Sequence, residues 1–356
     1  MTDRSHDTLH AVTPYGRSAG SARVRVFDWL DWLGLEASNE TYLNGSSHSP
    51  ATFARSPLGI LAAEMRLRRL ATEITDETVL LSRQASPFSN GGVEERLLRA
   101  AARGVYDFDD ALMHSPPGRL EQLWSKKKIW ARSVAAADVV IAGNDFLRAE
   151  ADALNPNVVM VPSCVNPNDY ERKNKYNIGD VPRAVWLGSP STEAYLQLVA
   201  RPLLELHRSI GLRLTLISAG AADVGALAPM VDRVQWSQQS VATNLAAADF
   251  GIMPLDDTPW TRGKCAYKLL QYGASRLPLV GSPVGANRDV LSASAGFAPD
   301  SSDEWVSAIE TLVNEAPEHR AHRGQRALET VLNSYSFAAW ETTWRSALGL
   351  QPSNRL

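Results

Sequence analysis

The sequence predicts an α/β protein of two domains, and three observations lead to this prediction. The chain has 356 residues, more than one hydrophobic core usually organises. Short apolar runs alternate with helical segments along most of its length, the pattern of a parallel sheet covered by helices. Residues 247–287 show this unit most clearly, because a strand at 250–253, a polar loop, a helix and a strand at 277–280 follow one another.

Composition and charge narrow the class of protein. An apolar fraction of 44% and a charged fraction of 21% are those of a globular protein. The net charge of −3 gives no overall electrostatic footprint for nucleic acid, so we expect no nucleic-acid partner. The two cysteines, Cys164 and Cys265, are too few for a disulfide framework or a cysteine zinc site. With no apolar signal-peptide core and no membrane-length apolar run, we expect a cytoplasmic protein that at most contacts a membrane surface weakly.

The first elements are a strand at 8–13, a small-residue loop that contains Gly20 and Ser21, and an amphipathic helix at 22–33. Arg23 and Arg25 lie at the start of this helix, close to the end of the preceding strand. Open α/β sheets bind ligands at the carboxyl ends of their strands, so these arginines are candidates for holding a ligand. Ordinary surface arginines are the alternative.

A polar loop at 37–56 precedes a helix at 57–71, which ends in Arg66, Arg68 and Arg69. A basic amphipathic helix can lie on anionic lipid. Because Glu64 and Glu73 interrupt the basic residues, a solvated helix face is the preferred interpretation.

The remainder of the first half continues the alternation, with strands at 78–81, 104–107, 139–142 and 158–161 and helices at 94–102, 120–136 and 144–154. A carboxylate cluster of Asp107, Asp109 and Asp110 closes the second of these strands. Such a cluster could bind metal, act as a base or cap the next element. No histidine or further acid follows at ligand spacing, so contacts to a polar ligand or a structural cap are favoured over metal.

Residues 166–182 are polar and contain proline and glycine, so we interpret them as an interdomain linker. The strand at 184–187 then ends in a small-residue turn with Gly188, Ser189 and Thr192, ahead of a helix at 193–210. Glycine lets a ligand approach the backbone, and the hydroxyls are donors. The elements that follow are strands at 212–217 and 233–235 and helices at 302–313, 318–333 and 337–347. Trp236 could stack on a base or pack as a surface aromatic.

The loop after the strand at 250–253 carries Arg262 and Lys264 and is expected to open into a helix at about Lys264. Helix starts suit anions, since their backbone N–H groups are unpaired and the dipole is positive there. Lys264 and Lys268 are four apart and would share one helix face, which favours an anion between them. A solvated basic face is the alternative. Together with the turn at Gly188, this loop predicts two walls of one phosphate pocket.

These segments resemble the retaining glycosyltransferases of the GT-B fold, family 4 type. The matching pieces are VYDFDDAL at 105–112, IAGNDFL at 141–147, WLGSPSTEAYL at 186–196, DFGIMPL at 249–255, GKCAYKLLQY at 263–272 and PLVGSPVGAN at 278–287. The resemblance implies two Rossmann-like domains that face each other across a cleft. The acceptor domain would be residues 1–165 with the C-terminal helix 336–356, in which Trp340 and Trp344 cross back to it. Residues 183–335 would hold the nucleotide-sugar.

The sequence departs from this family at its glutamate pair. The first glutamate contacts the donor sugar and the second contacts the ribose hydroxyls, and the corresponding positions here look like Gly263 and Gln271. Gln271 can still hydrogen-bond a diol, whereas Gly263 has no side chain to contact the sugar.

The resemblance implies transfer of a sugar from a nucleoside diphosphate sugar to an acceptor hydroxyl, with retention and front-face attack. We expect Arg262, Lys264 and Lys268 and the backbone amides of Cys265, Ala266 and Tyr267 to stabilise the departing diphosphate without a metal. Asp109 would orient the donor sugar or the acceptor. Gly20, Ser21, Arg23 and Arg25 would hold the acceptor, which could be a saccharide, a lipid-linked saccharide or a small natural product. A GT-B nucleotide-sugar epimerase, with His10 or His114 as catalytic candidates, and a non-catalytic sugar-binding partner subunit are the alternatives.

Overall fold

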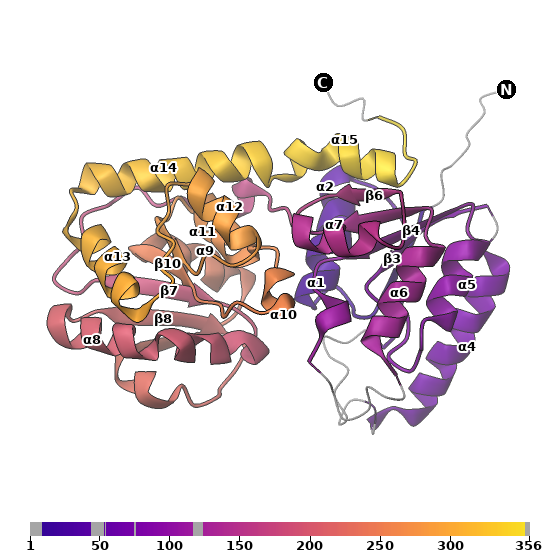
Figure 1. Cartoon of the computed structure of the whole chain (residues 1–356), viewed down its shortest axis with the longest axis horizontal. Coiled ribbons are helices and arrows are strands. Elements are labelled where there is room, and N and C mark those ends of the chain that lie inside the picture. Colours follow the sequence, from indigo (N-terminus) through magenta and orange to yellow (C-terminus); the bar gives the residue numbers. More distant parts are fainter. Residues whose placement is uncertain (1–8, 44–52, 54, 75, 117–123, 353–356) are drawn as a thin grey trace. The chain divides into compact units, whose positions relative to one another are not determined.

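A computed structural model describes residues 9–43, 53, 55–74, 76–116 and 124–352 (Figure 1). The chain divides into two compact units. The first unit consists of Met1–Ser163, Gly263–Cys265 and Trp340–Leu356, and the second of Cys164–Arg262 and Ala266–Ala339. Each unit is built around its own parallel sheet.

The first unit contains a six-stranded sheet in the order β2-β1-β3-β4-β5-β6. All of its strand pairs are parallel, so the carboxyl ends of the strands meet at one edge. The strands are β1 (Leu9–Thr13), β2 (Ser38–Thr41), β3 (Thr78–Ser82), β4 (Arg103–Phe108), β5 (Val139–Ala142) and β6 (Val158–Met160). The inner strands β3 and β5 are mainly apolar, as expected of strands buried on both faces of a parallel sheet.

The helical elements of the first unit follow its strands in alternation. They are α1 (Gly20–Ala22), the π-helical turn η1 (Arg23–Phe27), α2 (Asp28–Leu33), α4 (Pro57–Glu73), α5 (Gly92–Ala100), the 3-10 turn η2 (Leu112–His114), α6 (Lys126–Ala136) and α7 (Asp145–Asp152). Within the described ranges, no helix combines the length and the apolar character that crossing a membrane requires.

The C-terminal helix α15 (Phe337–Ala347) brings the chain back to the first unit, as the sequence predicts. Its Trp344 is fully buried and stacks on Trp29 of α2, with ring centroids 5.0 Å apart and planes 5° from parallel. The chain end is also tied to the sheet, because Arg103 Nε donates to the carbonyl oxygen of Ala347 at 2.8 Å. Two buried aromatic faces and this hydrogen bond explain why the last helix belongs to the first unit.

The second unit contains a five-stranded parallel sheet in the order β11-β10-β7-β8-β9. Its strands are β7 (Arg183–Leu187), β8 (Arg213–Ser218), β9 (Val231–Gln235), β10 (Phe250–Met253) and β11 (Leu279–Gly281). Its helical elements are η3 (Pro167–Asp169), η4 (Pro190–Val199), α8 (Ala200–Ile210), η5 (Gly225–Met230), α9 (Gln238–Ala247), α10 (Pro259–Arg262), α11 (Tyr267–Ala274), α12 (Ala286–Ala293), α13 (Ser302–Asn314) and α14 (Pro317–Ser334).

Two hydrophobic layers sandwich this second sheet. In β7, Ala184 and Trp186 face the layer that contains α8 and α13, while Val185 and Leu187 face the layer that contains α11 and α14. This alternation is the two-residue period of a strand buried on both faces. Figure 1 shows α8 and α13 among the helices that surround the strands of this unit.

The predicted α/β alternation is confirmed, and the strands at 139–142 and 250–253 and the helix at 337–347 have their predicted bounds. Other bounds are corrected. The predicted loop at 37–56 includes β2, and the helix predicted at 193–210 is a 3-10 segment, η4, followed by α8. Part of that loop, and the start of the helix predicted at 120–136, lie outside the described residues. The sequence analysis did not predict α9 and α12.

Candidate functional site

The carboxyl edge of the first sheet gathers acidic and basic side chains from several strands. Asp109 and Asp110 follow β4, and Arg83 follows the neighbouring strand β3. Arg83 Nη1 lies 2.8 Å from Asp110 Oδ2 and 3.5 Å from Asp109 Oδ1. The same nitrogen donates to Ser21 Oγ at 3.1 Å, which brings the predicted residue Ser21 into the cluster.

The backbone of Arg83 is held in an unusual conformation. Its φ of 62° lies in the left-handed region, which a residue with a side chain seldom adopts. The Tyr106 hydroxyl donates to the Arg83 carbonyl oxygen at 2.8 Å, and the Arg83 N–H donates to the Asp107 carbonyl oxygen at 2.8 Å. These bonds hold the strained turn so that the guanidinium reaches Asp110.

The segment Gly263–Cys265 belongs to the first unit and completes this cluster. Lys264 Nζ donates to Asp110 Oδ1 at 3.1 Å, and the Cys265 thiol donates to the Asp109 carbonyl oxygen at 3.3 Å. A Cβ at position 263 would lie 2.6 Å from the Cβ of Ala111. Glycine at 263 therefore permits close backbone packing, and a glutamate would not fit in this arrangement.

Burial and neighbouring charges shift the pKa values of Asp109 and Asp110 in opposite directions. Burial raises the pKa of Asp109 to about 6, and the adjacent Asp110 adds to the rise although Arg83 opposes it. Burial alone would also raise the pKa of Asp110, but Arg83 and Lys264 lower it. Among the described residues, Asp109 Oδ1 accepts no hydrogen bond. The cluster thus offers one stable carboxylate and one carboxyl group that titrates near neutral pH.

Arg25 does not belong to this partly buried cluster, which corrects the prediction that it holds an acceptor. Its side chain is 1% exposed, and it donates to both carboxylate oxygens of Asp107, at 3.0 and 2.6 Å. A third bond joins Arg25 Nη1 to the Val161 carbonyl oxygen at 2.8 Å. All three guanidinium nitrogens of Arg25 therefore donate hydrogen bonds within the core. Burial raises the pKa of Asp107, and Arg25 opposes that rise.

The remaining residues predicted at the start of the first helix stay near the surface. Gly20 is exposed at the start of α1, with no other heavy atom within 4 Å of where a Cβ would be. Arg23 is partly exposed, and its Nε lies 3.8 Å from Asp28 Oδ2. Of the two arginines, Arg23 alone keeps access to solvent.

In the second unit, the turn after β7 is organised by its own hydroxyls. Thr192 Oγ1 donates to the Ser189 carbonyl oxygen at 2.9 Å, and Ser189 Oγ lies 3.0 Å from Ser191 Oγ. A Cβ at Gly188 would lie 2.4 Å from Cη2 of Trp186. Glycine at 188 therefore lets the turn lie directly against the indole ring.

Lys268 meets the same indole. Its Nζ lies 5.3 Å from the centroid of the Trp186 ring, a cation–π distance. Lys268 is in the first turn of α11, whose position against β7 is fixed by a bond from Leu187 N–H to the Tyr272 hydroxyl at 2.9 Å. The two walls predicted from the sequence, the Gly188 turn and Lys268, thus share Trp186 as a common support.

The start of α11 differs from the prediction. The helix begins at Tyr267, after Ala266 adopts a φ of 54°, so Lys264 is not part of it. Lys264 and Lys268 therefore do not share a helix face, and Lys264 and Cys265 instead belong to the first unit, where they contact Asp110 and Asp109. Arg262 is exposed and is bound by Asp257, with Nε–Oδ1 and Nη2–Oδ2 distances of 2.6 and 3.0 Å.

Two further predicted donor residues lie in the second unit away from Trp186. Gln271 is buried at 7% exposure, and its Nε2 donates to the Tyr170 hydroxyl at 3.1 Å. Trp236 is 39% exposed and follows β9, at the edge of the sheet. Residues 166–182, interpreted as a linker, pack on this unit, because Tyr170 contacts Gln271 and Lys173 Nζ lies 3.7 Å from Asp249 Oδ1.

The histidines considered for other chemistry lie in ion pairs. His10 Nδ1 is 3.4 Å from Glu77 Oε2 near the amino ends of β1 and β3, and His114 Nε2 is 3.0 Å from Glu150 Oε1. In the described part of the chain, no three histidine, cysteine or acidic side chains gather as metal ligands would.

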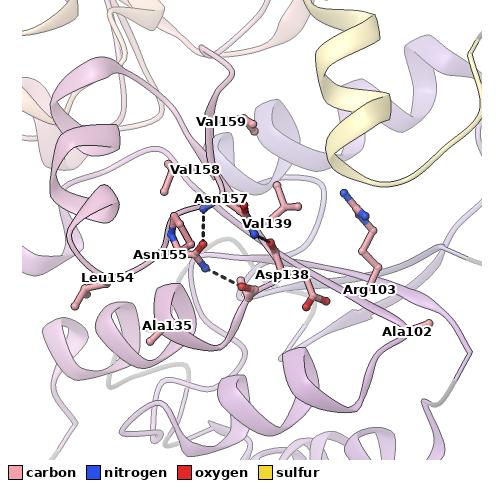
Figure 2. Close-up of a pocket in the computed structure, with 12 residues that line it drawn as sticks. Ala102, Arg103, Ala135, Asp138, Val139, Leu154, Asn155, Asn157, Val158 and Val159 are labelled. Carbon is pink, nitrogen blue, oxygen red and sulfur yellow. Dashed lines mark hydrogen bonds between the residues drawn. The ribbon is translucent and has the colours of Figure 1, made fainter.

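A cavity of about 870 Å³ lies at the opposite, amino edge of the first sheet (Figure 2). Its lining includes Arg103, Val139 and Val158, the first residues of three strands. Asn155 Nδ2 donates to the carbonyl oxygens of Val134 and Ala137, at 2.8 and 2.7 Å. These hydrogen bonds hold the loop between α7 and β6, so we assign the cavity no part in the candidate site.

The sequence analysis missed two residues that organise these clusters, Arg83 and Trp186. Arg83 comes directly after a predicted strand, as the carboxylates after β4 do, and the same strand-end argument would have selected it. Trp186 lies within a strand, and only the structure shows that its ring contacts both Gly188 and Lys268.

Comparison with solved structures identifies proteins with the same fold. No protein-family model matches the sequence, and no curated protein matches it. Solved structures do match. HepE from Anabaena in complex with UDP has a TM-score of 0.70 at 11% identity, covering 96% of this chain and 99% of that one. WaaG, a glycosyltransferase involved in lipopolysaccharide biosynthesis, has a TM-score of 0.65 at 13% identity, covering 96% and 100%.

A UDP-forming α,α-trehalose-phosphate synthase from Burkholderia xenovorans has a TM-score of 0.63 at 13% identity, covering 96% of this chain and 99% of that one. At sequence identities this low, the similarity shows a shared fold and not a shared function. The fold of this chain, with two parallel-sheet α/β units, is the GT-B fold of these structures.

Proposed function

We propose that this protein is a retaining glycosyltransferase that moves a sugar from a nucleoside diphosphate sugar to an acceptor hydroxyl. The proposal rests on one observation: Lys268 and the Gly188 turn both lie against the ring of Trp186. A cation, a helix start and a glycine turn next to one another suit a diphosphate. HepE, which has the same fold, was crystallised with UDP, and we therefore expect a UDP-sugar as the first donor to test.

Lys268, the start of α11 and the Gly188 turn would stabilise the leaving group. The bond between the anomeric carbon and the phosphate oxygen breaks, and its electron pair stays on that oxygen. The acceptor oxygen bonds the anomeric carbon on the same face, and its proton passes to the departing phosphate. Lys268 and the first N–H groups of α11 would stabilise the growing negative charge. Arg262, the last residue of α10, would contribute by exchanging its Asp257 partner for the diphosphate. With these groups in place, we propose that transfer needs no metal ion.

The cluster of the first unit is assigned to the acceptor side. Asp109, whose side chain is 14% exposed, would accept a hydrogen bond from a sugar or acceptor hydroxyl. The space around Gly20 is open, because no heavy atom lies within 4 Å of where its Cβ would be. Ser21, Arg23 and Arg83 are the proposed hydrogen-bond donors to the acceptor. The cationic side chains suit an anionic saccharide or a lipid-linked acceptor.

The experiment measures nucleoside diphosphate release from UDP-, ADP-, GDP-, CDP- and dTDP-sugars, with and without saccharide acceptors. Lys268→Ala should lower the transfer rate about 10²- to 10³-fold, the effect of removing one group that stabilises transition-state charge. Lys175→Ala is the matched control, because Lys175 is an exposed lysine of the same unit. An unchanged rate in Lys268→Ala would refute the assignment. Conversion of a donor sugar without any acceptor would instead favour an epimerase.

A further inference from the structure

Helix α4 presents a second apolar face that folding of the unit does not use. Ala63 and Leu67 are buried against the rest of the unit. Leu58, Leu61 and Met65 are 80%, 59% and 63% exposed. Their spacings of three and four residues place these three side chains on one side of the helix. A contiguous exposed apolar stripe of this kind marks an interaction surface.

A basic groove flanks the same helix. It has a volume of about 650 Å³ and lies where α4, α5 and α6 meet, and its charged lining is Arg68, Arg96, Arg99, Arg132 and Glu95. Glu95 is bound by two of the arginines, with Arg99 Nε at 3.2 Å and Arg132 Nη2 at 2.6 Å. Among the described residues, Arg68 and Arg96 have no carboxylate partner. Four arginines against one glutamate form a local positive excess on a chain whose net charge is −3.

The apolar stripe and the groove form one continuous surface. Leu61 and Arg68 are seven residues apart, two helical turns, and so lie on the same side of α4. Figure 1 shows α4 and α5 next to each other in the first unit. The acidic residues of α4 do not cancel the charge here. Glu64 accepts from the Tyr42 hydroxyl at 2.9 Å on the inner side, and Glu73 pairs with Arg69.

We propose that this surface docks the protein on an anionic phospholipid bilayer. Leu58, Leu61 and Met65 would enter the boundary between headgroups and acyl chains, and the arginines of the groove would contact the lipid phosphates. Interfacial helices combine an apolar strip with adjacent basic residues in this way.

A bilayer fits the observations better than other anionic partners. Free phosphate or nucleic acid would use the arginines but leave the three apolar side chains in water. A protein partner of ordinary size would bury a wider patch than three side chains along two turns. A lipid surface uses both features at once, and charge complementarity selects an anionic one.

The test is co-sedimentation of the whole protein with vesicles, in the absence of any donor or acceptor. Vesicles of phosphatidylcholine alone are compared with equimolar phosphatidylcholine and phosphatidylglycerol. The expected result is binding to the anionic vesicles at least about tenfold tighter than to the neutral ones, weakening as salt is raised. Because no sugar chemistry is involved, failure here leaves the proposed transferase activity untouched.

Two variants separate the contributions of the apolar stripe and of the groove arginines to vesicle binding. Leu61→Glu/Met65→Glu replaces two of the three apolar side chains of the stripe, and Arg68→Glu/Arg96→Glu reverses the charge of the two groove arginines that have no carboxylate partner among the described residues. Each should lower vesicle affinity at least about tenfold, with an unchanged melting temperature. The matched controls are Leu154→Glu and Arg148→Glu, since these residues are an exposed leucine and an exposed arginine near α7 of the same unit. Both controls should bind as the wild type does.

Four results would overturn the proposal. The first is no binding to anionic vesicles, and the second is an equal loss in the control variants. The third is self-association, seen by sedimentation velocity and abolished by Leu61→Glu/Met65→Glu, which would assign the stripe to a second copy of the chain. Competition of vesicle binding by millimolar inorganic phosphate would assign the groove to free phosphate instead.

Discussion

Replacement of Arg25 by methionine tests the core of the first unit most sharply. Arg25→Met removes three hydrogen bonds, leaving the Asp107 carboxylate and the Val161 carbonyl oxygen buried without these partners. Breaking a buried ion pair by removing one partner costs about 3–5 kcal/mol. For a unit of this size, that loss lowers the melting temperature by about 6–20 °C.

The assay is differential scanning calorimetry, with Arg17→Met as the matched control. Arg17 also pairs with an aspartate at 2.6 Å, but it is 57% exposed and its partner Asp31 is 60% exposed. An exposed pair contributes about 1 kcal/mol or less, so the control should lose little stability. Equal melting temperatures for the two variants would refute the reasoning that burial, rather than pairing distance, sets the cost.

The same variant should respond to pH in a defined direction. Burial raises the pKa of Asp107 in the folded state, and loss of Arg25 removes the larger of the two opposing influences, leaving only Arg83. A carboxyl group whose folded pKa exceeds its unfolded value gives stability at low pH that is lost as the pH rises through the folded pKa. Arg25→Met should therefore be less destabilised at pH 5 than at pH 8. A stability difference between Arg25→Met and the wild type that stays constant from pH 5 to pH 8 would contradict the conclusion that the Asp107 carboxylate becomes costly without Arg25.

Three further predictions follow from the site. Gly263→Ala should lower the stability of the first unit by about 1–3 kcal/mol in calorimetry, because its Cβ would meet Ala111, whereas Gly179→Ala, with nothing within 4 Å, should not. The transfer rate should rise as the pH passes about 6, where Asp109 ionises, and Asp109→Asn should lose that inflection in a pH–rate profile while remaining folded by circular dichroism. Excess EDTA should leave the transfer rate unchanged, and a loss restored by Mg²⁺ would refute the metal-free proposal.

Local sequence patterns were enough to predict the α/β class, and the family resemblance supplied the GT-B arrangement. The apolar runs at 139–142 and 250–253 are short, flanked by turn residues and buried on both faces, so the strand bounds were predicted directly. The resemblance to the GT-B fold implied that the last helix, with Trp340 and Trp344, returns to the first domain, and Trp344 stacks on Trp29 there. Strand-end reasoning also placed Asp109 and the Gly188 turn at the correct edges of their sheets.

The errors at the site come from contacts that local patterns do not carry. Arg23 and Arg25 were treated as a pair, yet residues two apart on a helix point in different directions, so one stays near solvent and the other enters the core. Lys264 was placed at a helix start because the polar loop was expected to open into the helix at that residue. Its contact with Asp110, 154 residues away in sequence, and the left-handed turn at Ala266 place it elsewhere.

The central claim is that the second unit binds a diphosphate through Lys268 and the Gly188 turn. Isothermal titration calorimetry with UDP and UMP, followed by ADP, GDP, CDP and dTDP, tests it most directly. We predict that one diphosphate binds more tightly than its monophosphate, that Lys268→Ala weakens this binding at least about tenfold, and that Lys175→Ala does not. No binding of any diphosphate, or equal affinity in Lys268→Ala and the wild type, would contradict the claim.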